Sequence, residues 1–396
     1  MVLNRLKNKL VGGDSSETSG DGDGVDVINS ENQSILMGII SQLRPGCDLT
    51  RITLPTFILE HKSMLERITN AFFTPDILLQ ANDTVDNAQR FALIVKWYLS
   101  SWHIAPKAVK KPLNPVLGEV YSCYWDDLPG NLSAYYLAEQ TSHHPPESSY
   151  FYLIPDKRIR ADGVLIPRSR FLGNSSAAMM EGVAHLELGQ HSGEIYSLSQ
   201  PNIYCRGILF GKLRYELGDH MLIKCEKLGL EADIEFKTKG FISGDYDVVE
   251  GTIKDTATSQ VLFIIRGKWN EKLEIEDTQT GETSLFYDTT SSQIWKPKVK
   301  PLEKQLPNES RKLWAPTLSA LEKNDHAIAT DEKFIVEERQ RELAQKRREN
   351  NERFVPEFFE ESTSEVPFII RADINIYEDS PENMKSKLYS IYDIET

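Results

Sequence analysis

The spacing of hydrophobic residues changes along the chain and divides its larger part into three regions. From Leu65 to His103, apolar residues recur at helical intervals. Beyond them, apolar and polar residues alternate in short runs between Gly, Asp, Asn and Pro turns, which predicts strands. After Trp295 the chain is predicted to be helical again and is highly charged.

The middle region predicts an antiparallel sheet, because no helical crossover of useful length interrupts it. So many consecutive strands must curl into a barrel or split into a sandwich. Residues 51–60 are expected to be extended as well. The strands are predicted at Ser148–Ile154, Gly182–Leu188, Glu194–Leu198, Ile203–Glu216, Ala232–Phe236, Tyr246–Lys254, Gln260–Gly267, Lys272–Glu276 and Ser284–Asp288.

A short amphipathic helix is predicted ahead of these regions. Ser30 and Gln33 fit a capping box, and Arg44-Pro45-Gly46 ends the helix. Its apolar face consists of Ile35, Leu36, Ile39, Ile40 and Leu43. Such a helix either packs permanently on the core or acts as a movable lid. Residues 1–28 end in an acidic, Gly- and Ser-rich stretch and are expected to be a disordered tether.

Composition and charge narrow the classes of function. Hydrophobic residues make up 40% and charged residues 26%, as in soluble globular proteins. The net charge of −14 argues against nucleic acid and against permanent adhesion to anionic membranes, but allows brief membrane contact. We expect neither a secretory signal nor a membrane span. The four cysteines do not stand at metal-ligand spacing, so reduced thiols are the simplest interpretation.

The adjacent pair His143-His144, followed by Pro145-Pro146, is the most unusual local feature. Adjacent strand residues point to opposite faces, but the prolines end regular pairing, so both imidazoles are able to face one opening. A purely structural pair is the alternative. Glu147 is the nearest carboxylate after the pair, and no cluster at zinc or iron spacing is nearby, so neither a metal nor a cofactor is expected.

Two further groups of charged residues stand out. Lys110-Lys111-Pro112-Leu113-Asn114-Pro115 places two cations and an amide in a proline-restricted loop. The spacing of four residues turns a helix by about 40° more than one full turn. One helical face would therefore carry Lys333, Glu337 and Arg341. Taken alone, these groups are also consistent with a surface turn and an exposed ion-pair ladder, because residues 331–353 carry seven basic and seven acidic side chains.

Together these motifs resemble a known family. Glu139-Gln-Thr-Ser-His-His-Pro-Pro146 is similar to the signature octapeptide of the oxysterol-binding-protein-related proteins, with Thr141 where the family usually has Val. The segment from Lys111 to Glu119 resembles a second block of that family, and Lys333, Glu337 and Arg341 stand where its C-terminal basic helix contributes. The resemblance spans roughly residues 35 to 360.

The resemblance implies a mainly β fold with α-helices: an incomplete, many-stranded antiparallel β-barrel around an apolar lipid tunnel, with an N-terminal helical lid. It divides the chain into a tether (1–28), a lid (29–50), a barrel with N-terminal helices (51–300), a C-terminal helical region (301–366) and a tail (367–396). No catalytic role is expected. A phosphohydrolase using the two histidines is the competing class, and it lacks an evident nucleophile.

The resemblance also implies ligands. In the family, the phosphates of phosphatidylinositol 4-phosphate meet the positions held here by His143, His144, Lys111, Lys333 and Arg341, with Asn114 assisting and Glu337 orienting the cations. The run from Asp48 to Glu60 is similar to the branch that carries phosphatidylserine rather than sterol. There the serine lipid contacts the positions of Ile52, Leu54, Thr56, Asn114 and Ser169.

These resemblances predict a cytosolic lipid-transfer protein that exchanges phosphatidylserine for phosphatidylinositol 4-phosphate, visiting the endoplasmic reticulum and the plasma membrane transiently. Sterol as the second cargo, and a lipid sensor without net transport, are the alternatives. Glu357-Phe358-Phe359-Glu360-Glu361 faintly resembles a motif that binds an endoplasmic-reticulum receptor. The same aromatic residues are equally expected to close the C-terminal region of the fold.

Overall fold

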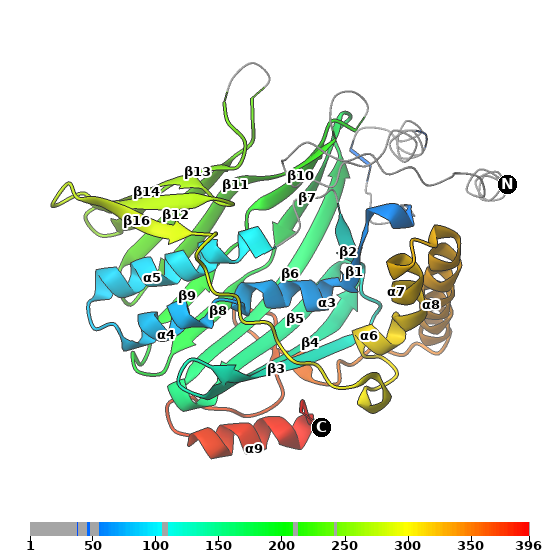
Figure 1. Ribbon diagram of the computed structural model, residues 1–396. Coiled ribbons are helices and arrows are strands. Elements are labelled where there is room, and N and C mark those ends of the chain that lie inside the picture. The colour runs from blue at the N-terminus through cyan, green and yellow to red at the C-terminus, as the bar shows by residue number, and fades with distance from the viewer. Residues whose placement is uncertain are drawn as a thin grey trace.

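The computed structural model describes residues 38, 46–47, 55–104, 110–208, 213–240 and 244–395 (Figure 1). Within them, the strands form one fourteen-stranded antiparallel sheet and two separate two-stranded sheets. The strands are β1 (Leu59–Ser63), β2 (Lys111–Leu113), β3 (Val120–Leu128), β4 (Leu132–His143), β5 (Pro146–Ile154), β6 (Ile159–Phe171), β7 (Ser175–Glu181), β8 (Ala184–Leu188), β9 (Ile195–Leu198), β10 (Asn202–Arg206), β11 (Arg214–Cys225), β12 (Leu230–Lys237), β13 (Val248–Asp255), β14 (Val261–Lys268), β15 (Lys272–Asp277), β16 (Thr283–Asp288), β17 (Phe359–Glu361) and β18 (Phe368–Ile370).

The large sheet follows the chain order closely, from β3 at one edge to β16 at the other. It forks once, between β6 and β11. One branch runs through β7 and β10, and the other through β8 and β9, because the long strand β6 pairs with β7 near one end and with β8 near the other. The edge strands β3 and β16 are not paired with each other in the described residues, so the barrel is incomplete, as predicted.

Short helices before β2 lie across one face of the curved sheet (Figure 1). Their apolar residues, including Phe72, Phe91 and Trp97, form one buried cluster with the inner faces of the strands. Asp86 caps the longest of them, accepting a 2.8 Å hydrogen bond from the backbone N–H of Gln89. These helices are η2 (Thr56–Ile58), α3 (Met64–Arg67), η3 (Ile68–Phe72), α4 (Pro75–Asp83), α5 (Asn87–Ser100) and η4 (Trp102–Ile104).

The C-terminal part covers the opposite face of β4 and β5. Residues of β18 and of the last helix form a second buried cluster with Leu137 and Phe151. In β4 and β5, alternate side chains therefore belong to different clusters, and both faces are buried. The helices after the sheet are η6 (Leu302–Lys304), α6 (Ser310–Leu313), α7 (Ala315–Glu322), α8 (His326–Glu349) and α9 (Pro381–Ile391).

The nine predicted strand segments all contain strands, and helices lie in both regions predicted to be helical, although the second also contains β17 and β18. Within the segment 51–60, which was expected to be extended, Thr56–Ile58 forms a 3-10 helix instead. One prediction was wrong in its connectivity: Ile203–Glu216 is not one strand, because β10 and β11 pair antiparallel across it, with Arg206 opposite Arg214. The alternation concealed a reversal that begins near Gly207, whose φ is 77°.

Four long strands were missed: β3, β4, β6 and β7. β4 is buried on both faces, so its sequence lacks the alternation of apolar and polar residues that usually marks a strand. The lid face (Ile35, Leu36, Ile39, Ile40, Leu43) lies outside the described residues, and the domain boundaries stay predictions. No helix in the described part of the chain is long and apolar enough to span a membrane.

Candidate functional site

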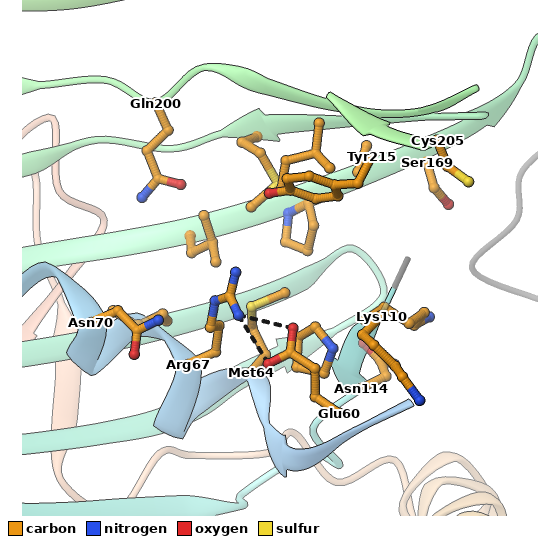
Figure 2. Close-up of a pocket in the computed structure, with 18 of the residues that line it drawn as sticks. Glu60, Met64, Arg67, Asn70, Lys110, Asn114, Ser169, Gln200, Cys205 and Tyr215 are labelled. Carbon is orange, nitrogen blue, oxygen red and sulfur yellow. Dashed lines mark hydrogen bonds and ion pairs between the residues drawn. The ribbon is translucent and has the colours of Figure 1, made fainter. Parts of the chain in front are cut away.

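An apolar cavity lies between the N-terminal helices and the inner face of the sheet (Figure 2). One wall comes from β1, α3 and η3, and the facing wall from β6, β7, β10 and β11. Most of the lining is hydrophobic, as in pockets that bury an apolar ligand. Its apolar residues include Ile58, Met64, Ile68, Leu113, Leu165, Met180 and Ile203.

Cations line the part of the cavity formed by β2 and the residues beside it. β2 runs parallel to β1, with Leu59 opposite Lys111, and this pairing brings Lys110, Lys111 and Asn114 into the lining. Lys110 Nζ donates a 2.8 Å hydrogen bond to the carbonyl of Phe57. Lys111 lines the cavity, and the residue is exposed although many protein atoms surround it.

Lys111 is electrostatically coupled to α8. Its enclosed surroundings lower the pKa of Lys111, and the positive charge of Lys333 lowers it further, whereas Glu337 acts in the opposite direction. Lys333 and Glu337 form an ion pair one helical turn apart. The predicted partners Lys111, Lys333 and Glu337 are therefore brought together, and an anionic ligand would relieve the repulsion between the two ammonium groups.

His143 and His144 occupy the tight connection between β4 and β5, where His143 is opposite Pro146. Their ring centroids are 4.6 Å apart. Burial lowers the pKa of His143 to about 4, and His144 contributes in the same direction, while the backbone of Pro115 and the charge of Glu337 oppose them. His143 is therefore neutral at physiological pH, and its Nδ1 is buried without a partner among the described residues.

Arg341 lies further along α8, where it lines a surface groove together with both histidines. Its guanidinium pairs with Glu338, at 2.7 Å from Nη2, rather than with the predicted Glu337. The arginine is about half exposed. It therefore lines the same groove as the histidines but is paired with Glu338 and not with Glu337. Further arginines line the same groove, namely Arg347, Arg348, Arg353 and Arg371.

Buried polar contacts fix the position of α8, and the sequence did not reveal them. Gln340 Oε1 accepts a 2.7 Å hydrogen bond from the backbone N–H of Leu117, in the loop that follows β2. Glu119, at the end of this loop, is buried and accepts from Ser310 and from the indole N–H of Trp314. The Gln340 bond holds the helix that carries Lys333 against the loop that follows Lys111, and the Glu119 bonds hold α6 and Trp314 against the same loop.

Glu139, the first residue of the octapeptide, has an anchoring role. Its carboxylate accepts hydrogen bonds from the backbone N–H groups of Glu357, at 2.8 Å, and Phe358, at 2.9 Å. Burial raises the pKa of Glu139 to about 7, although both N–H groups stabilise the carboxylate. Phe358 and Phe359 are buried in the C-terminal cluster, which supports the structural interpretation of these two phenylalanines.

Thr141, which stands where the family usually has Val, is also accommodated. Its hydroxyl lies 2.9 Å from Ser149 Oγ on the neighbouring strand, so the buried polar group has a partner. Val has no hydroxyl to satisfy at this position. The departure from the family pattern therefore leaves no unpaired hydroxyl at this buried position.

The structure describes only some of the residues that were predicted to contact the serine lipid. Ile52 and Leu54 lie outside the described residues. Ser169 and Asn114 both line the cavity. Thr56 is buried, and its hydroxyl donates a 3.2 Å hydrogen bond to the carbonyl of His326 at the start of α8. A role for Thr56 at the ligand stays a prediction.

Polar residues inside the cavity were missed by the sequence reasoning. Arg67 Nη1 donates to both carboxylate oxygens of Glu60, each at 2.9 Å, and both residues line the cavity (Figure 2). Asn70 lines it as well, and its Oδ1 is buried without a partner among the described residues. No sequence pattern marks this group, because only the β1–α3 junction brings its members to one wall.

Comparison with known proteins gives the same picture. The sequence profile of the oxysterol-binding protein family matches residues 38–385. The chain is 60% identical to the oxysterol-binding protein-like protein OBPa of Candida albicans over 369 residues, which cover 92% of this chain and 85% of that protein.

Two solved structures share the fold. The ORD domain of Osh1 in complex with cholesterol is similar with a TM-score of 0.75, at 23% identity, over 93% of this chain and 92% of that chain. The ORD of Osh3 in complex with PI(4)P from Saccharomyces cerevisiae is similar with a TM-score of 0.67, at 20% identity, over 92% and 94%.

An apolar cavity lined at one side by cations, inside an incomplete barrel, defines a lipid-binding domain. The chain belongs to the oxysterol-binding protein family.

Proposed function

We propose that this protein extracts phosphatidylserine and phosphatidylinositol 4-phosphate from membranes and exchanges one for the other, without catalysis. The observation that carries the proposal is an apolar cavity whose lining includes Lys111, a residue electrostatically coupled to the Lys333–Glu337 ion pair, while Glu337 is also coupled to His143. A ligand that uses both parts must have an anionic head and long apolar chains.

The head-group end suits a phosphomonoester. Such a group carries nearly two negative charges and several strong acceptors, and it forms charge-assisted hydrogen bonds with ammonium and imidazolium groups. Lys111 and Lys333 supply charge. His143 and His144 supply imidazole N–H donors, and bound phosphate would itself favour a protonated His143. Arg341 would join them after leaving Glu338, and Asn114 would assist with its amide.

Phosphatidylserine is the proposed second cargo. Asn114 and Ser169 line the cavity and support this choice, together with the predicted contacts of Ile52, Leu54 and Thr56. Both lipids would fill one cavity, so each would displace the other. Sterol is the alternative cargo, because a related fold has been solved in complex with cholesterol.

Transport follows from the hydrophobic cost of moving a diacyl lipid through water. Each exposed methylene costs about 0.8 kcal/mol, so spontaneous exchange is very slow and a carrier must enclose both chains. The predicted lid would open at a bilayer and close in the cytosol. A gradient of the phosphoinositide would then drive the serine lipid between the endoplasmic reticulum and the plasma membrane.

A vesicle assay tests the proposal. Donor vesicles contain labelled phosphatidylserine or labelled phosphatidylinositol 4-phosphate. The protein is incubated with these and with unlabelled acceptor vesicles. Wild type should transfer each lipid intact, and His143→Ala with His144→Ala should abolish phosphoinositide extraction while sparing phosphatidylserine. His220→Ala is the matched control, because this exposed histidine pairs with Asp233 away from the cavity. Release of free phosphate, or binding without transfer, would contradict the proposal.

A second substitution tests the serine-lipid contacts. Leu54→Asp should impair phosphatidylserine extraction more than phosphoinositide extraction. Unchanged phosphatidylserine extraction by this variant would argue against that placement of the cargo. Cholesterol extraction in place of phosphatidylserine by the wild type would favour the sterol alternative.

A further inference from the structure

An ion pair sits in the wall of the apolar cavity. Glu60 belongs to β1 and Arg67 ends α3, and their side chains are 5% and 17% exposed. Arg67 Nη1 donates to both oxygens of Glu60. A charged pair withdrawn from water loses much of its hydration, and well-packed apolar residues in its place are often neutral or stabilising. Stability alone therefore does not account for the pair.

The guanidinium of Arg67 has donors left over. An arginine carries five N–H donors, and the two bonds to Glu60 both come from Nη1. In the described part of the chain, Nε and Nη2 make no hydrogen bond. Figure 2 shows Arg67 projecting from α3 into the space that Tyr215 faces from β11. Among the described residues, nothing accepts from these three N–H donors, which belong to a residue that lines the cavity.

The charge of the pair indicates which ligand group fits. Glu60 neutralises Arg67, so this part of the wall offers donors without net positive charge. A second anion would gain little there, whereas a neutral acceptor such as an ester carbonyl gains a hydrogen bond to a charged donor.

The place of the pair along the cavity agrees with this assignment. Glu60 follows Leu59, which is opposite the cation Lys111, and the same wall continues through Arg67 to Asn70. In Figure 2 the pair lies between Lys110, at the cationic end, and Asn70, and most of the remaining lining is apolar. In a diacyl phospholipid the ester groups likewise lie between the head group and the acyl chains.

We propose that Arg67, held by Glu60, is a positioning residue that binds the ester carbonyl oxygens of diacyl phospholipids. This proposal rests on the proposed phospholipid-transfer function and deepens it. It makes the cavity selective for ester-linked glycerolipids, whichever head group they carry.

The first experiment needs no variant. Vesicles of phosphatidylcholine contain, as a minor component, either diacyl phosphatidylserine or its dialkyl ether analogue of the same chain length, which lacks both carbonyls. Wild type should extract the diacyl form about tenfold better, the value of one hydrogen bond to a charged group. Equal extraction of the two forms would overturn the proposal and leave the transfer function intact.

The second experiment assigns the preference to the pair. Glu60→Leu combined with Arg67→Met removes both charges and avoids leaving one of them buried and unpaired. This double variant should still extract phosphatidylserine, but with a diacyl-to-ether ratio near one. A folded double variant that keeps the wild-type ratio would overturn the proposal, and the wild-type comparison decides the matter if the variant does not fold.

A matched control lies next in the chain. Glu66 pairs with Arg311, whose Nη2 lies 2.7 Å from Oε1, and neither residue lines the cavity. Glu66→Leu with Arg311→Met should keep the wild-type ratio. A cholesterol arm separates the remaining outcomes. Extraction of cholesterol but of neither phosphatidylserine form would overturn both this proposal and the proposed cargo. If wild type extracts the diacyl and ether forms equally and the Glu60/Arg67 variant extracts less cholesterol, the donors of Arg67 would be assigned to a sterol hydroxyl instead.

Discussion

The carboxylate of Glu139 accepts a 2.9 Å hydrogen bond from the backbone N–H of Phe358, although 219 positions separate the two residues. This bond connects the strand that ends at the histidine pair to the C-terminal segment that covers the outer face of the sheet. The octapeptide therefore combines two roles. Its histidines lie at the candidate head-group site, and its glutamate holds the C-terminal segment against the sheet.

Removal of this anchor should destabilise the protein. Glu139→Ala leaves the N–H groups of Glu357 and Phe358 buried without their acceptor, and we expect a loss of about 3 kcal/mol in the free energy of unfolding. Denaturant unfolding measures it. Glu357→Ala is the control, because its backbone N–H is retained and its stability should stay close to wild type. Equal stability of Glu139→Ala and wild type would refute the anchoring role.

The same carboxylate should make stability depend on pH. Its pKa is raised by burial to about 7 in the folded protein, above the 4.5 of an unperturbed Glu. The folded state therefore binds the proton more tightly, and this group's contribution to stability falls as pH rises from about 4.5 to 7.

Glu139→Gln removes the titrating group and should abolish that part of the pH dependence. As pH rises from about 4.5 to 7, wild type should lose stability relative to Glu139→Gln, by at most about 1.4 kcal/mol of unfolding free energy per pH unit. Thermal or chemical unfolding at several pH values gives the difference. A constant difference would show that Glu139 does not titrate there.

Binding of the phosphoinositide head group should take up a proton at His143. The pKa of His143 is lowered by burial to about 4 in the ligand-free protein, and a bound phosphate raises it. Affinity should therefore increase, relative to His143→Asn, as pH falls from about 7.5 toward 5.5. Calorimetry with inositol 1,4-bisphosphate, in buffers of different ionisation enthalpy, counts the protons. Identical proton uptake by wild type and variant would contradict this linkage.

The contact between Gln340 and Leu117 should affect the head-group site specifically. Gln340→Leu leaves the Leu117 N–H without its 2.7 Å acceptor and loosens α8 against the loop that follows Lys111. We expect about tenfold weaker phosphoinositide extraction, with phosphatidylserine extraction much less affected. Gln345→Leu is the control, because Gln345 is exposed on the same helix and its side chain bonds only to Glu349 among the described residues. An equal effect of both substitutions would rule out this positioning role.

Local sequence determined much of this protein. Alternating burial in β12 is a property of a short segment, so periodicity predicts it. The histidine turn and the loop around Lys111 were also recognisable, because prolines restrict the backbone within a few residues of the chemistry.

Only the tertiary structure decided the rest. Hydrophobic periodicity states which side chains avoid water, but not which distant segment covers them. The double burial of β4 depends on a C-terminal segment more than 200 positions away, and the bond from Glu139 to Phe358 has the same origin. The Glu60–Arg67 pair faces the cavity because β1 turns into α3 beside β2, a geometry that the spacing of two charged residues does not encode.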